Sequence, residues 1–190
     1  MAYCTNTEVK TYLGITAATD DTLLTSMIAR VQDMIDRIAG MTFEASADST
    51  HKFDALKDVS GAILTFNTPL CAITSVTNGD TTTIASTKYV TNPRNVTPWT
   101  SIELLRSSGL FWTYTQDPQN AITIVGKWAY STSAPATIHD LCLIASCATY
   151  RLRDNPVGDT VSIESQVFQT PKDVAQFIQN QIEILGLRKY

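Results

Sequence analysis

The amino-acid sequence predicts an α+β fold in which a small four-helix core, with two N-terminal and two C-terminal helices, is interrupted by a β-rich insertion. Helical periodicity of apolar residues occurs only near the two ends of the chain, and the middle is rich in Thr, Ser, Val, Ile and aromatics. The 190 residues, 44% of them hydrophobic, are enough for a full core. Because helices and strands do not alternate, we expect residues 1–45 and 131–190 to form the helical core and 46–130 the insertion.

The first two helices have clear start and stop signals. Thr5 and Glu8 form a capping-box pattern, and Gly14 can adopt the left-handed conformation that ends a helix. A longer helix is expected from Asp20, whose carboxylate favours a helix start, to Gly40, with apolar residues spaced by three and four.

The middle of the chain is expected to be β structure, because turn pairs such as Asn78-Gly79 punctuate it. The expected strands are 62–66, 72–77, 101–105 and 121–128, with shorter pieces at 82–84 and 88–90. Helical periodicity returns after Pro135 and ends near Arg153, and this helix is apolar on nearly all sides, as expected of the central buried one. The polar stretch 154–169 is expected to be a linker or an extended arm, and a last helix should run from Thr170 to Gly186.

Composition argues against several function classes. The formal net charge is -4 and the charges are scattered, which argues against sequence-specific nucleic-acid binding. The four cysteines match neither a zinc knuckle nor a secreted disulfide framework, and Cys142 and Cys147 should point away from each other on one helix. We therefore expect no metal and no cofactor. No apolar run is long enough for a membrane span and the N-terminus lacks secretory-signal features, so we expect a protein assembled in the cytoplasm, without a membrane partner.

Catalytic signatures are weak. The common nucleotide, metalloprotease and α/β-hydrolase motifs do not occur, and a nucleophile-base pair would need His51 or His139. The pair His139-Asp140 is ordinary for a helix start, and Asp33 and Asp36, three apart on a helix, fit a solvated face better than an acid-base pair. The aromatics of the insertion lack interleaved basic residues, so core and subunit-interface roles are favoured over base stacking. A small hydrolase stays the less favoured alternative.

Several short patterns occur in an order that resembles one family. They are T-E-V-K-x-Y-L-G-I at 7–15, D-D-x-L-L at 20–24, I-D-x-x-x-G-x-x-F at 35–43, P-L-C-A-I-T-S-V at 69–76, the pair Lys88-Tyr89, I-x-I-V-G-K-W-A-Y at 122–130, the Pro135-x-x-Ile138 helix start and Y-R-x-R at 150–153. Together they resemble the head-tail connector (adaptor, or head-completion) proteins of tailed phages, over nearly the whole chain. The stretch 81–119 departs in length from that pattern.

The resemblance implies a non-enzymatic structural protein of the virion neck. Such proteins form a ring, commonly of twelve subunits, that docks beneath the portal, extends the channel for passing double-stranded DNA and seats the next neck or tail component. A mildly acidic wall would let DNA pass without sticking. The alternative within this class is a tail-completion or other phage interaction module, which would bind a tail tube instead of a portal.

The family uses its C-terminal segment to hold the portal. Carried over to this sequence, the resemblance implies seven portal contacts: Ile163, Val167, Phe168, Leu187, Arg188, Lys189 and Tyr190. The acidic residues assigned to the channel lumen are Asp33, Asp36 and Asp58.

Overall fold

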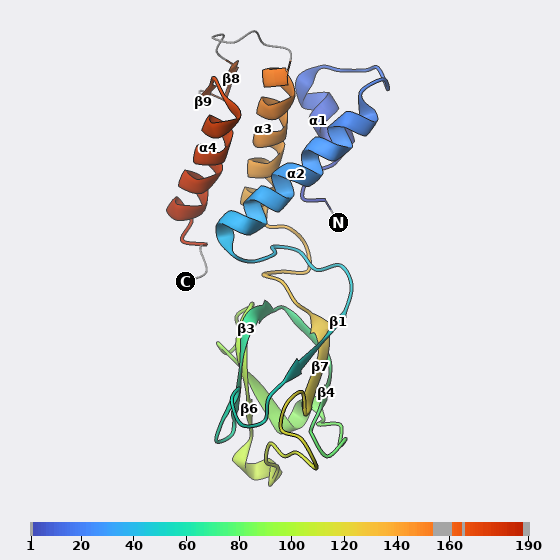
Figure 1. Ribbon diagram of the computed structural model, residues 1–190, viewed down its shortest axis with the longest axis vertical. Coiled ribbons are helices and arrows are strands. Elements are labelled where there is room, and N and C mark those ends of the chain that lie inside the picture. The colour runs from blue at the N-terminus through green and yellow to red at the C-terminus, as the bar shows by residue number, and fades with distance from the viewer. Residues whose placement is uncertain (1, 154–160, 165, 188–190) are drawn as a thin grey trace. The chain divides into compact units, whose positions relative to one another are not determined.

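The computed structural model describes residues 2–153, 161–164 and 166–187 and has the expected α+β class (Figure 1). The chain divides into two compact units. The helical unit comprises Met1–Met41 and Ala134–Tyr190, and the β unit comprises Thr42–Ser133. The sequence of the β unit therefore interrupts that of the helical unit.

The helical unit has four helices, two from each side of the interruption, as predicted. They are α1 (Asn6–Leu13), α2 (Asp21–Ala39), α3 (Ala136–Arg153) and α4 (Pro171–Ile184). Helix α3 contacts each of the other three. Its fully buried residues include Ile138, Cys142 and Ala145, so this nearly all-apolar helix occupies the centre of the unit, as its composition predicted.

The helix ends follow the capping chemistry expected from the sequence. The Glu8 amide donates to Thr5 Oγ1 at 3.2 Å, and the Thr5 amide donates to Glu8 Oε2 at 2.6 Å, which satisfies two backbone donors at the start of α1. Gly14 and Gly40 both have positive φ, 71° and 70°, at the C-terminal ends of α1 and α2. At the start of α4, the Thr170 amide donates to Asp173 Oδ2 at 2.7 Å.

Part of the stretch expected to be a linker or arm forms a short antiparallel hairpin. Its strands are β8 (Val161–Ile163) and β9 (Gln166–Phe168), while residues 154–160 lie outside the described part of the chain. The Phe168 ring packs edge-on against Phe177 of α4, with ring centroids 5.4 Å apart. Two strands of three residues are too short for their alternation to stand out in a polar sequence. The hairpin nevertheless contributes to the hydrophobic core of the helical unit.

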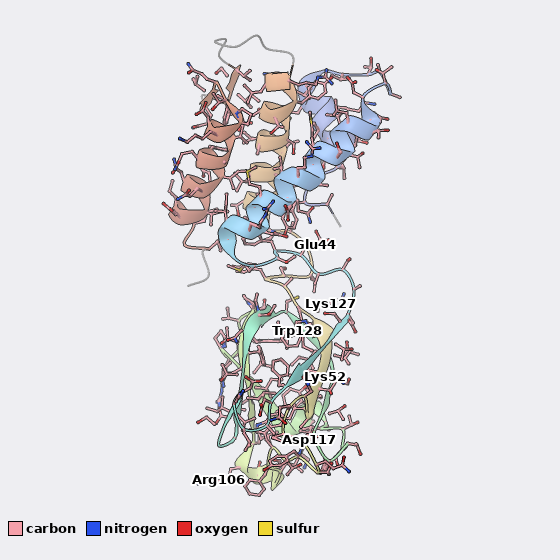
Figure 2. The ribbon with its side chains drawn as sticks, in the orientation of Figure 1. Glu44, Lys52, Arg106, Asp117, Lys127 and Trp128 are labelled. Atoms are coloured by element: carbon pink, nitrogen blue, oxygen red, sulfur yellow. The ribbon has the colours of Figure 1, made fainter. Side chains whose placement is uncertain are left out.

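The β unit contains two antiparallel sheets, of strand order β1-β7-β4 and β2-β3-β6-β5. The strands are β1 (Ser49–Phe53), β2 (Val59–Ser60), β3 (Ile63–Leu70), β4 (Ala72–Thr77), β5 (Tyr89–Asn92), β6 (Trp99–Leu104) and β7 (Ile122–Lys127). Both sheets contribute to one hydrophobic core, for example through Leu64 and Ile102 of one and Ile124 of the other. Trp128, labelled in Figure 2, belongs to the same core.

Some strand predictions were wrong. Residues 82–84 form no strand, and Thr83 makes only an isolated bridge with Thr77. Strands β1 and β2 were not expected, because β1 reads Ser-Thr-His-Lys before Phe53 and so lacks the alternation of apolar and polar residues that marks a strand. Strand β3 continues past the expected end at Phe66 through Pro69, which is accommodated where the β3–β6 register is irregular.

Candidate interaction surfaces

An aromatic loop of the β unit, residues 110–115, presents two large side chains to solvent. Phe111 is 76% exposed and Tyr114 is 44% exposed, whereas Asn78 beneath the loop is only 4% exposed. The Asn78 side-chain amide donates to the Phe111 carbonyl at 2.9 Å, and its oxygen accepts from the Thr113 amide at 3.0 Å. One buried amide therefore holds the backbone on both sides of Trp112.

Two further contacts fix the same loop. The Trp112 indole N–H donates to the Ala62 carbonyl at 2.8 Å. Gly79 lies so close to the backbone of the loop that a Cβ placed on it would be 2.2 Å from the Thr113 carbonyl oxygen. A loop held this firmly loses little conformational entropy on binding, so an exposed Phe on it is a good anchor for a protein partner.

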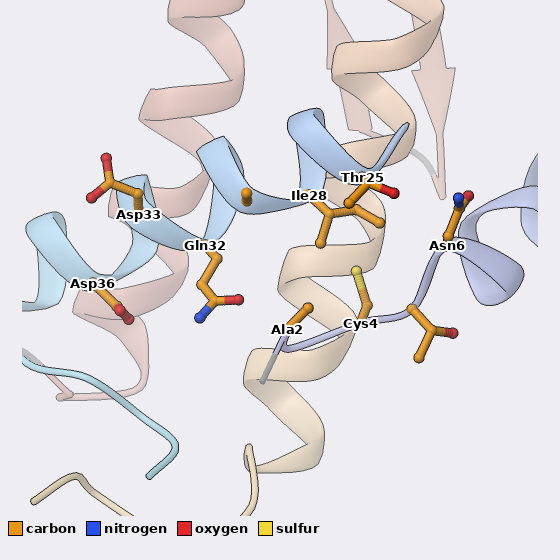
Figure 3. A pocket seen from close by; sticks show the side chains of 10 residues that line it. Ala2, Cys4, Asn6, Thr25, Ile28, Gln32, Asp33 and Asp36 are labelled. Carbon is orange, nitrogen blue, oxygen red and sulfur yellow. The ribbon is translucent and has the colours of Figure 1, made fainter. Parts of the chain in front are cut away.

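The helical unit has a mostly apolar groove of about 660 Å³ between its N-terminal segment and α2 (Figure 3). The groove is lined by Ala2, Cys4, Thr5, Asn6, Thr25, Ile28, Ala29, Gln32, Asp33 and Asp36. Burial raises the pKa of Asp36, while the hydrogen bond that the Tyr3 hydroxyl donates to it at 2.5 Å acts in the opposite direction. Asp33 pairs with Arg37 one turn further along α2 at 2.5 Å.

The structure thus brings Asp33 and Asp36, two of the residues assigned to the lumen, to the same groove. The third, Asp58, lies in the β unit, where its carboxylate accepts from the Asp54 amide at 2.8 Å. Its role in that loop is local: it closes the turn between β1 and β2.

The three hairpin residues that were expected to contact the portal differ in their exposure to solvent. Val167 is 60% exposed, whereas Ile163 is 3% and Phe168 1% exposed within the helical unit. Of the four terminal residues in the same set, Leu187 is half-buried after the end of α4, and Arg188, Lys189 and Tyr190 lie outside the described residues. The side chain of Val167 is therefore open to solvent, while Ile163 and Phe168 belong to the buried interior of the helical unit.

The two histidines lie in different surroundings. His139 Nδ1 lies 3.0 Å from Asp140 Oδ1, and Nε2 lies 3.2 Å from Glu8 Oε1. The hydrogen bond with Asp140 is the main cause that raises the pKa of His139, and Glu8 adds to it. His51 stacks on Trp128 with ring centroids 4.0 Å apart, and burial lowers its pKa. Both nitrogens of His139 thus face carboxylates rather than a nucleophile.

Within the described ranges, no three His, Cys, Asp or Glu side chains are grouped so as to hold a metal ion. Among the helices described, none is both long and apolar enough to cross a bilayer. Trp128 is buried, and Trp99 and Trp112 pack against the core of the β unit, which supports the core interpretation for the three tryptophans, whereas Phe111 and Tyr114 are exposed.

The fold is shared with chains of gene transfer agent (GTA) particles. One belongs to the neck of an empty GTA particle computed with C6 symmetry, at 15% sequence identity and a TM-score of 0.58. The other belongs to the virion of a native GTA particle, at 15% identity and a TM-score of 0.54. Each match covers 93% of this chain and 87% of the other. No protein-family model and no curated protein matches the sequence.

Sequence reasoning missed two features of these surfaces. Asn78 was interpreted only as a turn residue, and nothing local in the sequence indicates that its side chain supports a loop more than thirty residues away. The contact between Cys4 and Cys142, 138 positions apart, was also missed, because only cysteines close in sequence could be compared.

Proposed function

We propose that this chain is a non-enzymatic structural protein of the neck of a tailed-phage type of particle. Within that class, we assign it the role of head-tail adaptor: a ring that docks beneath the portal, extends the DNA channel and seats the next neck or tail protein. The observation that carries the proposal is the likeness of fold to a GTA neck chain over 93% of this chain, helical and β units together.

The resemblance of the sequence to head-tail connector proteins supports the same role independently of the fold. Its patterns fall on the two N-terminal helices, on β4 and β7, and on α3. They therefore cover both units. The C6 symmetry of the GTA neck is compatible with rings of six or of twelve copies, and the resemblance favours twelve.

The surfaces also suit assembly into a ring. A ring needs two different, complementary patches on each subunit. The β unit offers the aromatic loop with Phe111, and the helical unit offers the groove beside α2 and the exposed Val167. We assign the first two to contacts between neighbouring copies, and Val167 with the terminal residues 187–190 to the portal.

The acidic side chains at the groove suit a channel that DNA crosses without sticking. Asp33 is well exposed on α2, where Arg37 offsets part of its charge, and the overall charge of the chain is -4. Repulsion between carboxylates and phosphates disfavours binding of the duplex to the wall. Asp33 is therefore our candidate for a residue that faces the lumen.

The test is assembly of the purified full-length chain. Its molar mass is measured by light scattering over a concentration series, and negative-stain images are taken before and after a portal ring is added. We expect discrete rings, alone or on the portal. A chain that stays monomeric and does not bind portal would refute the adaptor role.

A second arm separates the adaptor from a tail-completion module. The same chain is mixed with assembled tail tubes in place of portal. Binding to tubes combined with failure to bind portal would move the protein to the tail side of the neck, while keeping it a structural virion protein.

A further inference from the structure

Two of the four cysteines face each other inside the helical unit. The sulfur atoms of Cys4 and Cys142 lie 3.5 Å apart in an S–H···S hydrogen bond, and both residues are buried. A disulfide needs the sulfurs at about 2.05 Å, so a shift of roughly 1.5 Å would join them. Cys4 precedes α1 in a non-helical segment, whereas Cys142 lies within α3.

The N-terminal segment is held in the position that keeps the two thiols together. The Tyr3 amide donates to Gln32 Oε1 at 3.2 Å, and the Tyr3 hydroxyl donates to Asp36 at 2.5 Å, both on α2. On the other side of Cys4, Thr5 caps α1. The backbone on each side of Cys4 is therefore fixed by polar contacts that do not involve sulfur.

The two thiols differ in reactivity. The Cys142 S–H can donate to a thiolate at Cys4, and this lowers the pKa of Cys4 below its ordinary value. The same contact, together with burial, raises the pKa of Cys142. Because Cys4 also lines the groove beside α2, we assign it as the nucleophile of the pair.

Cys4 lines a surface groove, and the two cysteines outside the pair, Cys71 and Cys147, are less reactive as thiols. Cys4 lines the open groove beside α2, where Figure 3 shows its side chain. Burial raises the pKa of Cys147 to about 12, and it also raises the pKa of Cys71, so these two thiols stay protonated at neutral pH.

We propose that Cys4 and Cys142 are a redox-active pair that forms an intramolecular disulfide with a peroxide as oxidant. The Cys4 thiolate attacks one peroxide oxygen, forms a sulfenic acid and releases hydroxide, which takes up the proton that Cys4 lost. The sulfur of Cys142 then attacks the Cys4 sulfur, the S–S bond forms and water leaves. Two thiols are oxidised and one hydrogen peroxide is reduced to two waters.

The disulfide would tie the N-terminal segment to α3. It would close a loop that contains α1, α2 and the entire β unit, since the two cysteines are 138 positions apart. A crosslink across so long a loop restricts the unfolded chain strongly and so stabilises the folded one. This chemistry does not depend on the proposed neck role, so a failed test would leave that role untouched.

The test uses the full chain, first reduced and desalted, then treated with a few equivalents of hydrogen peroxide. After denaturation and alkylation, we expect two unmodified cysteines fewer, a mass about 2 Da lower before alkylation, and a crosslinked peptide pair containing Cys4 and Cys142. Circular dichroism at 222 nm should show the helices melting about 5–10 °C higher than in the reduced chain, reversibly on addition of dithiothreitol.

The controls are Cys4→Ser, which should abolish both the crosslink and the shift, and Cys71→Ser and Cys147→Ser, which should keep both. Should Cys4→Ser fold poorly, the oxidised and reduced wild-type chains still provide the comparison. Four alkylated cysteines after treatment would overturn the proposal. A Cys4–Cys147 crosslink, or accumulation of sulfinic acid at Cys4 without a disulfide, would also overturn it.

Discussion

The substitution Phe168→Ala tests whether the β8–β9 hairpin belongs to the helical core. Phe168 is 1% exposed and packs edge-on against Phe177 at 5.4 Å. Truncating a fully buried Phe costs about 3–5 kcal/mol, of which the aromatic pair accounts for about 0.5–1.5 kcal/mol. Because domains are stable by only about 5–15 kcal/mol, the helical unit should lose about a fifth of its stability or more.

Two spectroscopic signals report separately on the stability of the helical unit and of the β unit. Circular dichroism at 222 nm follows the helices, whereas tryptophan fluorescence follows the β unit, because Trp99, Trp112 and Trp128 all lie in it. The urea midpoint of the helical signal should fall markedly in Phe168→Ala. The neighbouring exposed Val167→Ala is the matched control and should stay within about 0.5 kcal/mol of wild type. The packing argument would be refuted if the free energy of unfolding of the helical unit in Phe168→Ala lay within about 1 kcal/mol of wild type, because the expected loss is much larger.

Three further predictions concern other sites. Phe111→Ser should leave the free energy of unfolding within about 0.5 kcal/mol of wild type but weaken ring assembly, measured by light scattering, at least about tenfold. The control Leu56→Ser, at an equally peripheral position, should change neither the free energy of unfolding nor the assembly. The raised pKa of His139 means that its stabilising contribution is complete below the unfolded pKa and disappears as pH rises through the folded pKa. Thermal melts of His139→Gln should therefore show a loss of stability at pH 5.5 that becomes smaller by pH 8.5. Solvent screening limits this loss to about 0.5 kcal/mol. A loss of stability that does not change with pH would contradict the ion pairs. Gly126→Ala would place a Cβ 2.2 Å from the Ala72 carbonyl oxygen, so the β unit should lose about 3 kcal/mol by tryptophan fluorescence, and a neutral result would show that the strands can separate freely.

The sequence predicted the helices well because their signals are local. The Thr5–Glu8 capping box, the two glycines with positive φ and the spacing of apolar residues all act within one or two turns. Strand prediction was weaker because β1 owes its conformation to a partner elsewhere in the sequence: it pairs with β7, about seventy residues away.

The candidate surfaces were less accessible to sequence reasoning than the fold. Which aromatics are exposed depends on the whole β unit, and nothing in the sequence distinguishes the exposed Phe111 from the buried Phe66. The resemblance to connector proteins pointed to residues 163–168, but it could not show that Phe168 is buried while Val167 is exposed. Both distinctions depend on tertiary packing.

The division of the helical unit by the β unit imposes an order on biosynthesis. Every strand of the β unit is translated before α3, so this unit can fold while the ribosome is still completing the chain. Helix α2 packs against α3 and α4, and α1 packs against α2 and α3, so the helical unit is complete only after α3 and α4 are made. The surfaces of the β unit can therefore form before the helical unit is complete, whereas Val167, which lies after α3 in the sequence, is added later.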